Sequence, residues 1–127
     1  MIKNDDNQQR LLLVEDVPFL RYAFGRLLRR SGYDVMEAQD GRDALDRLTA
    51  FRPHVVVTDL MMPGMNGLEL IRHLHNDPET AQLPVVAITA DPTDYTEQRA
   101  REAGAVDFIA KPIDMCCLLE RLRAIRL

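Results

Sequence analysis

Hydrophobic residues along the chain form short continuous runs that alternate with stretches of helical spacing. The runs are typical of strands buried on both faces, because a strand covered on one face only would alternate between apolar and polar residues. We expect strands at residues 11–14, 34–38, 55–57, 85–89 and 106–109, and the third run ends at Thr58 and Asp59. The second run is the least apolar of the five.

The stretches between the runs carry apolar residues three and four positions apart, as amphipathic helices do. Five such stripes are expected to face a core: Leu20, Ala23, Phe24 and Leu27; Ala44, Leu45, Leu48 and Phe51; Leu70, Ile71 and Leu74; Tyr95, Ala100 and Ala103; and Met115, Leu118, Leu122 and Ile125. The stripe within residues 94–103 holds few large apolar residues, so this helix should be among the least stable elements. Five strands alternating with five helices predict a single α/β domain, with a parallel sheet covered on both faces.

Residues with reactive side chains stand at the ends of four predicted strands. Glu15 and Asp16 follow the first strand, and Asp59 follows the third. Thr89 ends the fourth strand, and Lys111 follows the fifth. Because the carboxyl ends of parallel strands share one edge of the sheet, we expect three carboxylates, a hydroxyl and an ammonium to converge there.

Such a group of side chains favours a particular chemistry. Crowded carboxylates repel one another unless a cation lies between them, and a site of oxygen ligands without Cys or His suits Mg²⁺ better than Zn²⁺. A carboxylate can also attack phosphorus and form an aspartyl phosphate, with Mg²⁺ and Lys111 neutralising the charge. Lys111 is one of only two lysines among 16 basic residues. Its compact ammonium suits a crowded acid site better than a planar guanidinium does.

The composition narrows the function classes. A chain of 127 residues fits one domain, and a net charge of −4 argues against a nucleic acid as the direct partner. No apolar stretch approaches the roughly 20 residues of a membrane helix. Residues 1–10 are polar and lack the apolar segment of a signal peptide, so we expect them to form a flexible N-terminal lead-in. Cys116 and Cys117 are adjacent and therefore ill suited to a structural disulfide, so we expect a reduced, cytoplasmic protein.

The chain resembles bacterial two-component response-regulator receiver domains, including those of the chemotaxis type, from about residue 11 to about residue 126. Four segments carry the resemblance: Leu-Leu-Leu-Val-Glu15-Asp16, Val-Val-Val-Thr-Asp59-Leu-Met-Met-Pro63-Gly-Met-Asn66-Gly67, Val-Val-Ala-Ile-Thr89-Ala90 and Gly104-Ala-Val-Asp-Phe108-Ile-Ala-Lys111-Pro112. The resemblance implies a receiver domain over residues 11–127. It also implies a doubly wound, flavodoxin-like (βα)5 fold with strand order 2-1-3-4-5.

The resemblance also implies roles for the acids at the strand ends. Asp59 matches the phosphoacceptor, and Asp16 matches the direct Mg²⁺ ligand. Glu15 matches the acid that holds metal-bound water, and Met61 occupies the position whose backbone carbonyl faces the metal. The expected metal-binding set is therefore Glu15, Asp16, Asp59 and Met61.

Three further residues match the family's switching machinery. Thr89 matches the hydroxyl that closes on the phosphoryl oxygens, and Lys111 the lysine that pairs with Asp59 and then with the phosphate. Phe108 occupies the position of a mobile aromatic ring that is often tyrosine. Because phenylalanine has no hydroxyl to form a hydrogen bond, Phe108 can report the state of the switch only through burial of its ring. The bond between Lys111 and Pro112 is cis in relatives.

These matches imply a phosphorylation-activated switch. It would take its phosphoryl group from a histidine kinase or a histidine phosphotransfer protein. It would then change the surface of the fourth helix, fifth strand and fifth helix for a downstream effector. Catalysis would be limited to its own phosphoryl transfer and dephosphorylation, with no membrane or direct nucleic-acid partner. A homodimer through the same surface is left open.

Other functions predict other residues. A receiver-like interaction module that works without phosphorylation would be expected to lack an acid or the lysine, and this chain keeps both. A dehalogenase-type phosphatase has a second Asp two positions after the first, where this chain has Met61. A flavin-binding relative needs a Ser-, Thr- or Gly-rich phosphate loop where this chain has Glu15-Asp16-Val17-Pro18.

Overall fold

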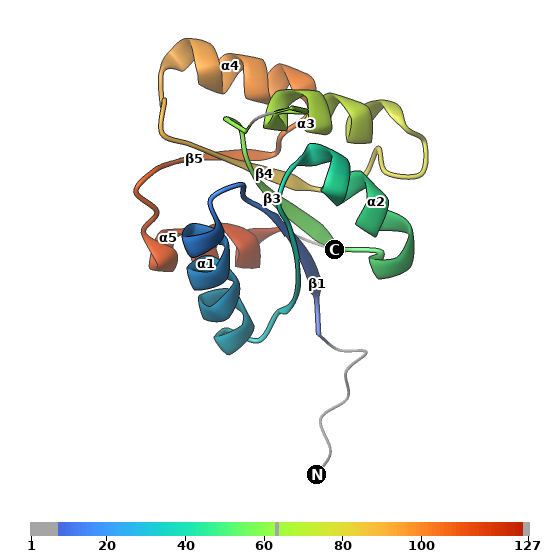
Figure 1. Cartoon of the computed structure of the whole chain (residues 1–127). Helices are drawn as coiled ribbons and strands as arrows, with labels where there is room; N and C mark the ends of the chain where they lie inside the picture. Colours follow the sequence, from blue (N-terminus) through green and yellow to red (C-terminus); the bar gives the residue numbers. More distant parts are fainter. Residues whose placement is uncertain (1–7, 63, 126–127) are drawn as a thin grey trace.

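The structure, a computed structural model, describes residues 8–62 and 64–125. A parallel sheet of five strands runs through the molecule, with helices on both of its faces (Figure 1). The strands are β1 (Arg10–Val14), β2 (Asp34–Ala38), β3 (Val55–Asp59), β4 (Val85–Thr89) and β5 (Asp107–Ala110). The helices are α1 (Pro18–Arg30), α2 (Gly41–Phe51), α3 (Gly67–Asn76), α4 (Asp94–Ala103) and α5 (Met115–Ala124).

The strands lie in the order β2-β1-β3-β4-β5, which confirms the predicted α/β fold and its strand order. All four strand pairs are parallel, so every strand ends at the same edge of the sheet. Their register places Asp59 beside Ile88 and Thr89 beside Ala110. The sheet therefore gathers the polar residues that follow its strands along one edge.

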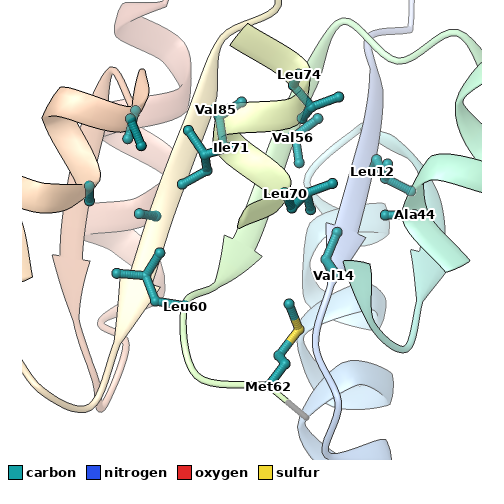
Figure 2. Packing of buried hydrophobic residues seen from close by; sticks show 14 of the residues in the cluster. Leu12, Val14, Ala44, Val56, Leu60, Met62, Leu70, Ile71, Leu74 and Val85 are labelled. Atoms are coloured by element: carbon teal, nitrogen blue, oxygen red, sulfur yellow. The ribbon is translucent and has the colours of Figure 1, made fainter. Parts of the chain in front are cut away.

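Two apolar clusters cover the two faces of the sheet. Leu12, Val14 and Val56 point into one cluster, which α2, α3 and α4 cover (Figure 2). Leu11 and Leu13 belong to the other cluster, covered by α1 and α5. Because successive strand residues point to opposite faces and both faces are covered, the central strands carry apolar residues on both faces, and β3 and β4 turn polar only where they reach the edge of the sheet.

Helix α1 faces the sheet through a different leucine from the one predicted. Leu27 is 42% exposed, whereas Leu28 is fully buried. Leu20 and Phe24 are half-buried, and Leu28 continues their spacing of four residues. The helical period places Leu27 about 100° away from that line, which turns it toward solvent.

Two other predictions need correction at the α4–β5 end of the sheet. Tyr95 is 68% exposed, and α4 is anchored instead by the small buried residues Ala100 and Ala103. The Tyr95 ring packs under the guanidinium of Arg99, 5.5 Å from the ring centroid, as part of an exposed turn. Strand β5 begins one residue later than expected, and Val106 is half exposed.

Strand β1 begins at Arg10, within the segment predicted as a lead-in. Arg10 pairs with Asp34 of β2, and its main-chain N–H donates to Nδ1 of His54 at 2.9 Å. Residues 1–7 of the predicted lead-in lie outside the described residues. None of the helices described has the length and apolar character needed to cross a bilayer.

Candidate functional site

Three acids meet at the carboxyl edge of the sheet. Glu15, Asp16 and Asp59 each place one carboxylate oxygen within 4.8 Å of the other two. Glu15 and Asp59 are only 2% and 5% exposed, whereas Asp16 is half-buried and is the most solvent-accessible of the three. The expected convergence of these acids is therefore observed.

Lys111 binds two of the three acids. Its Nζ donates to Oδ2 of Asp59 at 2.7 Å and to Oε1 of Glu15 at 3.1 Å. Burial disfavours the charged ammonium, but the hydrogen bonds and negative charges of Asp59 and Glu15 outweigh burial and raise the pKa of Lys111. The ammonium therefore stays protonated at neutral pH and acts as a permanent counter-charge.

Glu15 is held at every polar atom. Its amide donates to the carbonyl of Ala38 at 3.0 Å, and its Oε2 accepts from the amide of Val17 at 3.2 Å. Burial raises the pKa of Glu15, and the negative charge of Asp59 adds to that rise. The Val17 amide and Lys111 act in the opposite direction. On balance the pKa of Glu15 lies above its ordinary value, and a further cation beside this acid would favour its charged form.

The loop after β3 holds the second oxygen of Asp59. The main-chain N–H of Met61 donates to Oδ1 of Asp59 at 3.0 Å, while its side chain is 64% exposed. Helix α3 then begins directly against the strand, because Gly67 donates its N–H to the carbonyl of Leu60 at 3.1 Å. A Cβ at position 67 would lie 2.2 Å from the carbonyl oxygen of Asp59.

Thr89 ends the strand next to Asp59, and Phe108 lies on β5, the strand beyond it; neither side chain is hydrogen-bonded to the acids. The Thr89 side chain is fully buried, and its hydroxyl oxygen accepts from the amide of Asp91 at 3.0 Å. The Thr89 carbonyl accepts from the amide of Lys111 at 2.8 Å. Phe108 is half-buried on β5 opposite Ala87, where it packs against the cluster under α2, α3 and α4.

The donor set fits Mg²⁺. Among the described residues, Glu15, Asp16 and Asp59 form the only group of three potential ligands from Asp, Glu, His or Cys. Three carboxylates against one ammonium leave excess negative charge, and the half-buried Asp16 leaves a side for water. Mg²⁺ favours such a shell of oxygens and retained water. The peptide bond between Lys111 and Pro112 is cis, as the resemblance implies.

Two residues at this edge were not singled out from the sequence. In the sequence, Gly67 was quoted only as part of a family motif and was given no role. Its missing side chain lets α3 pack against the main chain of Asp59. Arg21 donates from Nη1 to the carbonyl of Glu15 at 2.8 Å, and no motif marks it. The sequence did offer a hint for Gly67. Glycine is a poor helix former, so a glycine at the first helical position, directly after the N-cap Asn66, suggests that a side chain would not fit there. For Arg21 there was none, because an arginine on a helix is usually a solvated charge.

Comparisons with known proteins agree with this geometry. Residues 11–123 match the family of the response regulator receiver domain. The chain is 33% identical to protein PilH of Pseudomonas aeruginosa over 116 residues, covering 91% of this chain and 96% of PilH. It is 40% identical to response regulator MprA of Mycolicibacterium vanbaalenii over 116 residues, but spans only 49% of that longer protein.

Solved structures show the same fold. The chemotaxis protein CheY4 of Vibrio cholerae superposes with a TM-score of 0.88 at 27% identity, over 94% of this chain and 99% of CheY4. A putative response regulator from Chloroflexus aurantiacus superposes with a TM-score of 0.87 at 30% identity, over 92% and 96%. With strand order and sequence in agreement over nearly the whole described chain, this protein belongs to the response regulator receiver domain family of bacterial two-component systems.

Proposed function

We propose that this receiver domain is a phosphorylation-activated switch that accepts a phosphoryl group on Asp59. One observation supports this choice above the others. Asp59 is held on one oxygen by Lys111 and on the other by the Met61 amide, at the centre of the acid group. A nucleophile held in this way presents its carboxylate in one orientation, which is most of what phosphoryl transfer requires of a protein.

The proposed reaction is a simple displacement. A carboxylate oxygen of Asp59 forms a bond to phosphorus, and the phosphorus–nitrogen bond of a phosphohistidine donor breaks. The electron pair leaves with the imidazole nitrogen, which then takes a proton from solvent. Asp16, Asp59 and the Met61 carbonyl would hold Mg²⁺, with Glu15 acting through metal-bound water, and the ion would offset the negative charge of the incoming phosphoryl group.

Lys111 supplies the protein's own share of that charge compensation. Its ammonium bridges Asp59 and Glu15, and the contact with Oδ2 of Asp59 can pass to a phosphoryl oxygen. Because the hydrogen bonds to both acids raise the pKa of Lys111, the ammonium donates without losing its proton. The Met61 amide remains available for the other oxygen of Asp59.

The conformational response would start at Thr89. Its hydroxyl accepts from the Asp91 amide, and the Asp91 carboxylate in turn accepts from the hydroxyl of Thr96 on α4 at 3.1 Å. If the Thr89 hydroxyl turned to a phosphoryl oxygen, this connection to α4 would loosen. Phe108 would then follow into the vacated space, and the surface formed by α4, β5 and α5 would change.

The partners that fit this function are a histidine kinase or a histidine phosphotransfer protein as donor, and a downstream effector at the changed surface. A direct nucleic-acid or membrane partner is not proposed, and a homodimer through the switch surface is left open. Catalysis is confined to the protein's own phosphorylation and dephosphorylation. Cys116 and Cys117 are free thiols, which agrees with a cytoplasmic location.

The test is labelling with acetyl phosphate in Mg²⁺, followed by intact-mass spectrometry. The natural protein and Asp46→Asn, which changes an exposed acid on α2, should each gain one phosphoryl group, and Asp59→Asn should gain none. Stoichiometric labelling of Asp59→Asn would refute the assignment of Asp59. If neither acetyl phosphate nor a phosphohistidine donor labels the natural protein, the alternative of an interaction module without phosphorylation holds instead.

A further inference from the structure

The turn between β1 and α1 carries both Glu15 and Asp16, and one peptide group joins them. The structure shows no hydrogen bond to the Asp16 carboxylate from any described residue, although Glu15 is held at both carboxylate oxygens. The position of Asp16 therefore depends on its main chain. Whatever fixes the peptide between these two acids also fixes the more exposed acid of the proposed metal site.

Arg21 holds that peptide. Its Nη1 donates to the Glu15 carbonyl at 2.8 Å, so the guanidinium binds the peptide that leads into Asp16. The main chain of Arg21 closes the first turn of α1 by donating to Val17 at 2.9 Å. One residue thus ties the start of the helix and the acidic turn together, and its side chain is only 20% exposed.

Glu37 on β2 lies at ion-pair distance from the same guanidinium. Oε1 of Glu37 lies 3.9 Å from Nε of Arg21, and Oε2 accepts from Nη1 of Arg29 at 2.8 Å. Gly25 gives Glu37 room, because a Cβ there would lie 2.7 Å from Oε2 of Glu37.

The same strand also holds the other end of Glu15. The amide of Glu15 donates to Ala38, the residue after Glu37, and its carbonyl is bound by Arg21. Strand β2 therefore fixes Glu15 at its amide directly and at its carbonyl through Arg21.

We propose that Arg21 is a positioning residue of the phosphorylation site, which orients the Glu15–Asp16 peptide, with Glu37 as its anchor. The inference rests on the proposed function only in taking this acid group as the Mg²⁺ site. Arg21 touches neither the metal position nor Asp59 in the structure, so it acts through the turn. Groups that orient metal ligands in this indirect way commonly change metal affinity when they are removed.

The charge of Arg21 makes the inference sharply testable. A cation near three acids weakens the attraction for a divalent ion, so loss of its charge alone would tighten Mg²⁺ binding. Loss of its positioning would instead weaken Mg²⁺ binding, because the acids would no longer be preorganised. The two effects have opposite signs, so the direction of change identifies the role.

The experiment measures Mg²⁺ binding by isothermal titration calorimetry on the unphosphorylated full chain. Arg21→Met should weaken binding about tenfold, the lower end of the usual cost of losing such an orienting group. Arg29→Met is the matched control, since it removes an arginine of the same helix and the other partner of Glu37 without touching Glu15. That control should bind Mg²⁺ as the natural protein does.

Two further variants separate positioning from folding. Arg21→Lys keeps the charge, but a single ammonium cannot span Glu15 and Glu37 as the guanidinium does, so its affinity should lie between those of the natural protein and Arg21→Met. Glu37→Gln should weaken Mg²⁺ binding less than Arg21→Met does. In amide NMR spectra, the signals of Asp16 and Val17 should shift in Arg21→Lys and stay in place in Arg29→Met.

Labelling by acetyl phosphate then tests the same site in its reaction. For Arg21→Met, half-maximal labelling should need about tenfold more Mg²⁺, and the rate at saturating Mg²⁺ should recover. Unchanged or tighter Mg²⁺ binding in both Arg21 variants would overturn the inference. The proposed function fails separately if the natural protein binds Mg²⁺ but no phosphodonor labels it.

Discussion

Gly67 is the position where a single added carbon should disturb Asp59, the proposed phosphoacceptor, most directly. It is the first residue of α3, where its amide donates to the Leu60 carbonyl. A Cβ there would lie 2.2 Å from the Asp59 carbonyl oxygen and 2.7 Å from Cα of Leu60. The first distance is more than an ångström short of ordinary van der Waals separation, and both neighbours are main chain and cannot rotate away.

The expected cost of Gly67→Ala follows from two opposing effects. Replacing glycine by alanine within a helix stabilises a protein by about 0.5–1 kcal/mol when nothing is in the way. Forcing packed main chain apart costs about 1–3 kcal/mol. We expect the second effect to dominate, with a net loss of about 1–2 kcal/mol in the free energy of unfolding. Labelling of Asp59 should slow as well, because the displaced backbone also carries the Met61 amide.

Gly25→Ala is the matched control on α1. A Cβ at Gly25 would lie 2.7 Å from Oε2 of Glu37, but that atom ends a flexible side chain that can move aside. Moving that atom weakens its exposed ion pair with Arg29, which costs little, so this variant should be neutral or more stable by up to about 1 kcal/mol. Gly67→Ala should thus lower the free energy of unfolding, whereas Gly25→Ala should leave it unchanged or raise it, although both glycines lie in helices.

The assay is urea unfolding followed by far-ultraviolet circular dichroism, since the chain has no tryptophan. Linear extrapolation yields the free energy of unfolding of each variant, and acetyl phosphate labelling yields the reaction rate. If Gly67→Ala were as stable as the natural protein and labelled at the same rate, the close approach of α3 to Asp59 would not constrain the site. That result would refute the argument from geometry.

Three further substitutions test other parts of the molecule. Thr89→Ala should still accept a phosphoryl group but lose the structural response, because it has no hydroxyl to move from the Asp91 amide to the phosphoryl group. If amide hydrogen exchange still differed between the unphosphorylated and phosphorylated variant as it does in the natural protein, this coupling would be contradicted. Lys111→Arg should slow labelling about tenfold or more although the charge is kept, because a planar guanidinium cannot fit between two acids; a natural rate would contradict this. Burial, and to a smaller extent the positive charge of Arg10, lowers the pKa of His54 from its ordinary 6.5. As the pH falls, His54 therefore takes up a proton in the unfolded chain before it does so in the folded protein. The contribution of His54 to stability is therefore complete above pH 6.5 and lost below it, and His54→Asn should lose less stability than the natural protein between about pH 7.5 and about pH 5.5 in urea unfolding. Equal losses would show that His54 makes no such contribution.

The apolar pattern predicted the elements well where both faces of a strand are buried. Strands β3 and β4 are buried at every residue, so their apolar runs mark them without ambiguity. The pattern was less informative at the surface, where Leu27 and Leu28 are equally apolar and only packing against the sheet selects Leu28. Tyr95 was wrongly assigned to the core for a similar reason. Helix α4 contacts the core through alanines, and an alanine in the sequence is a weak indicator of which helix face is buried.

The sequence by itself determined that acids and one lysine stand at the ends of parallel strands, because parallel pairing places all those ends at one edge. The strand order came from the family resemblance, since local patterns carry no information on which strands are neighbours. Only the tertiary structure decided that Lys111 bridges Glu15 and Asp59, which are 96 and 52 residues away from it, and that Arg21 binds the turn between the acids. Such contacts depend on the docking of whole helices and strands, and the spacing of residues along the chain does not encode that docking.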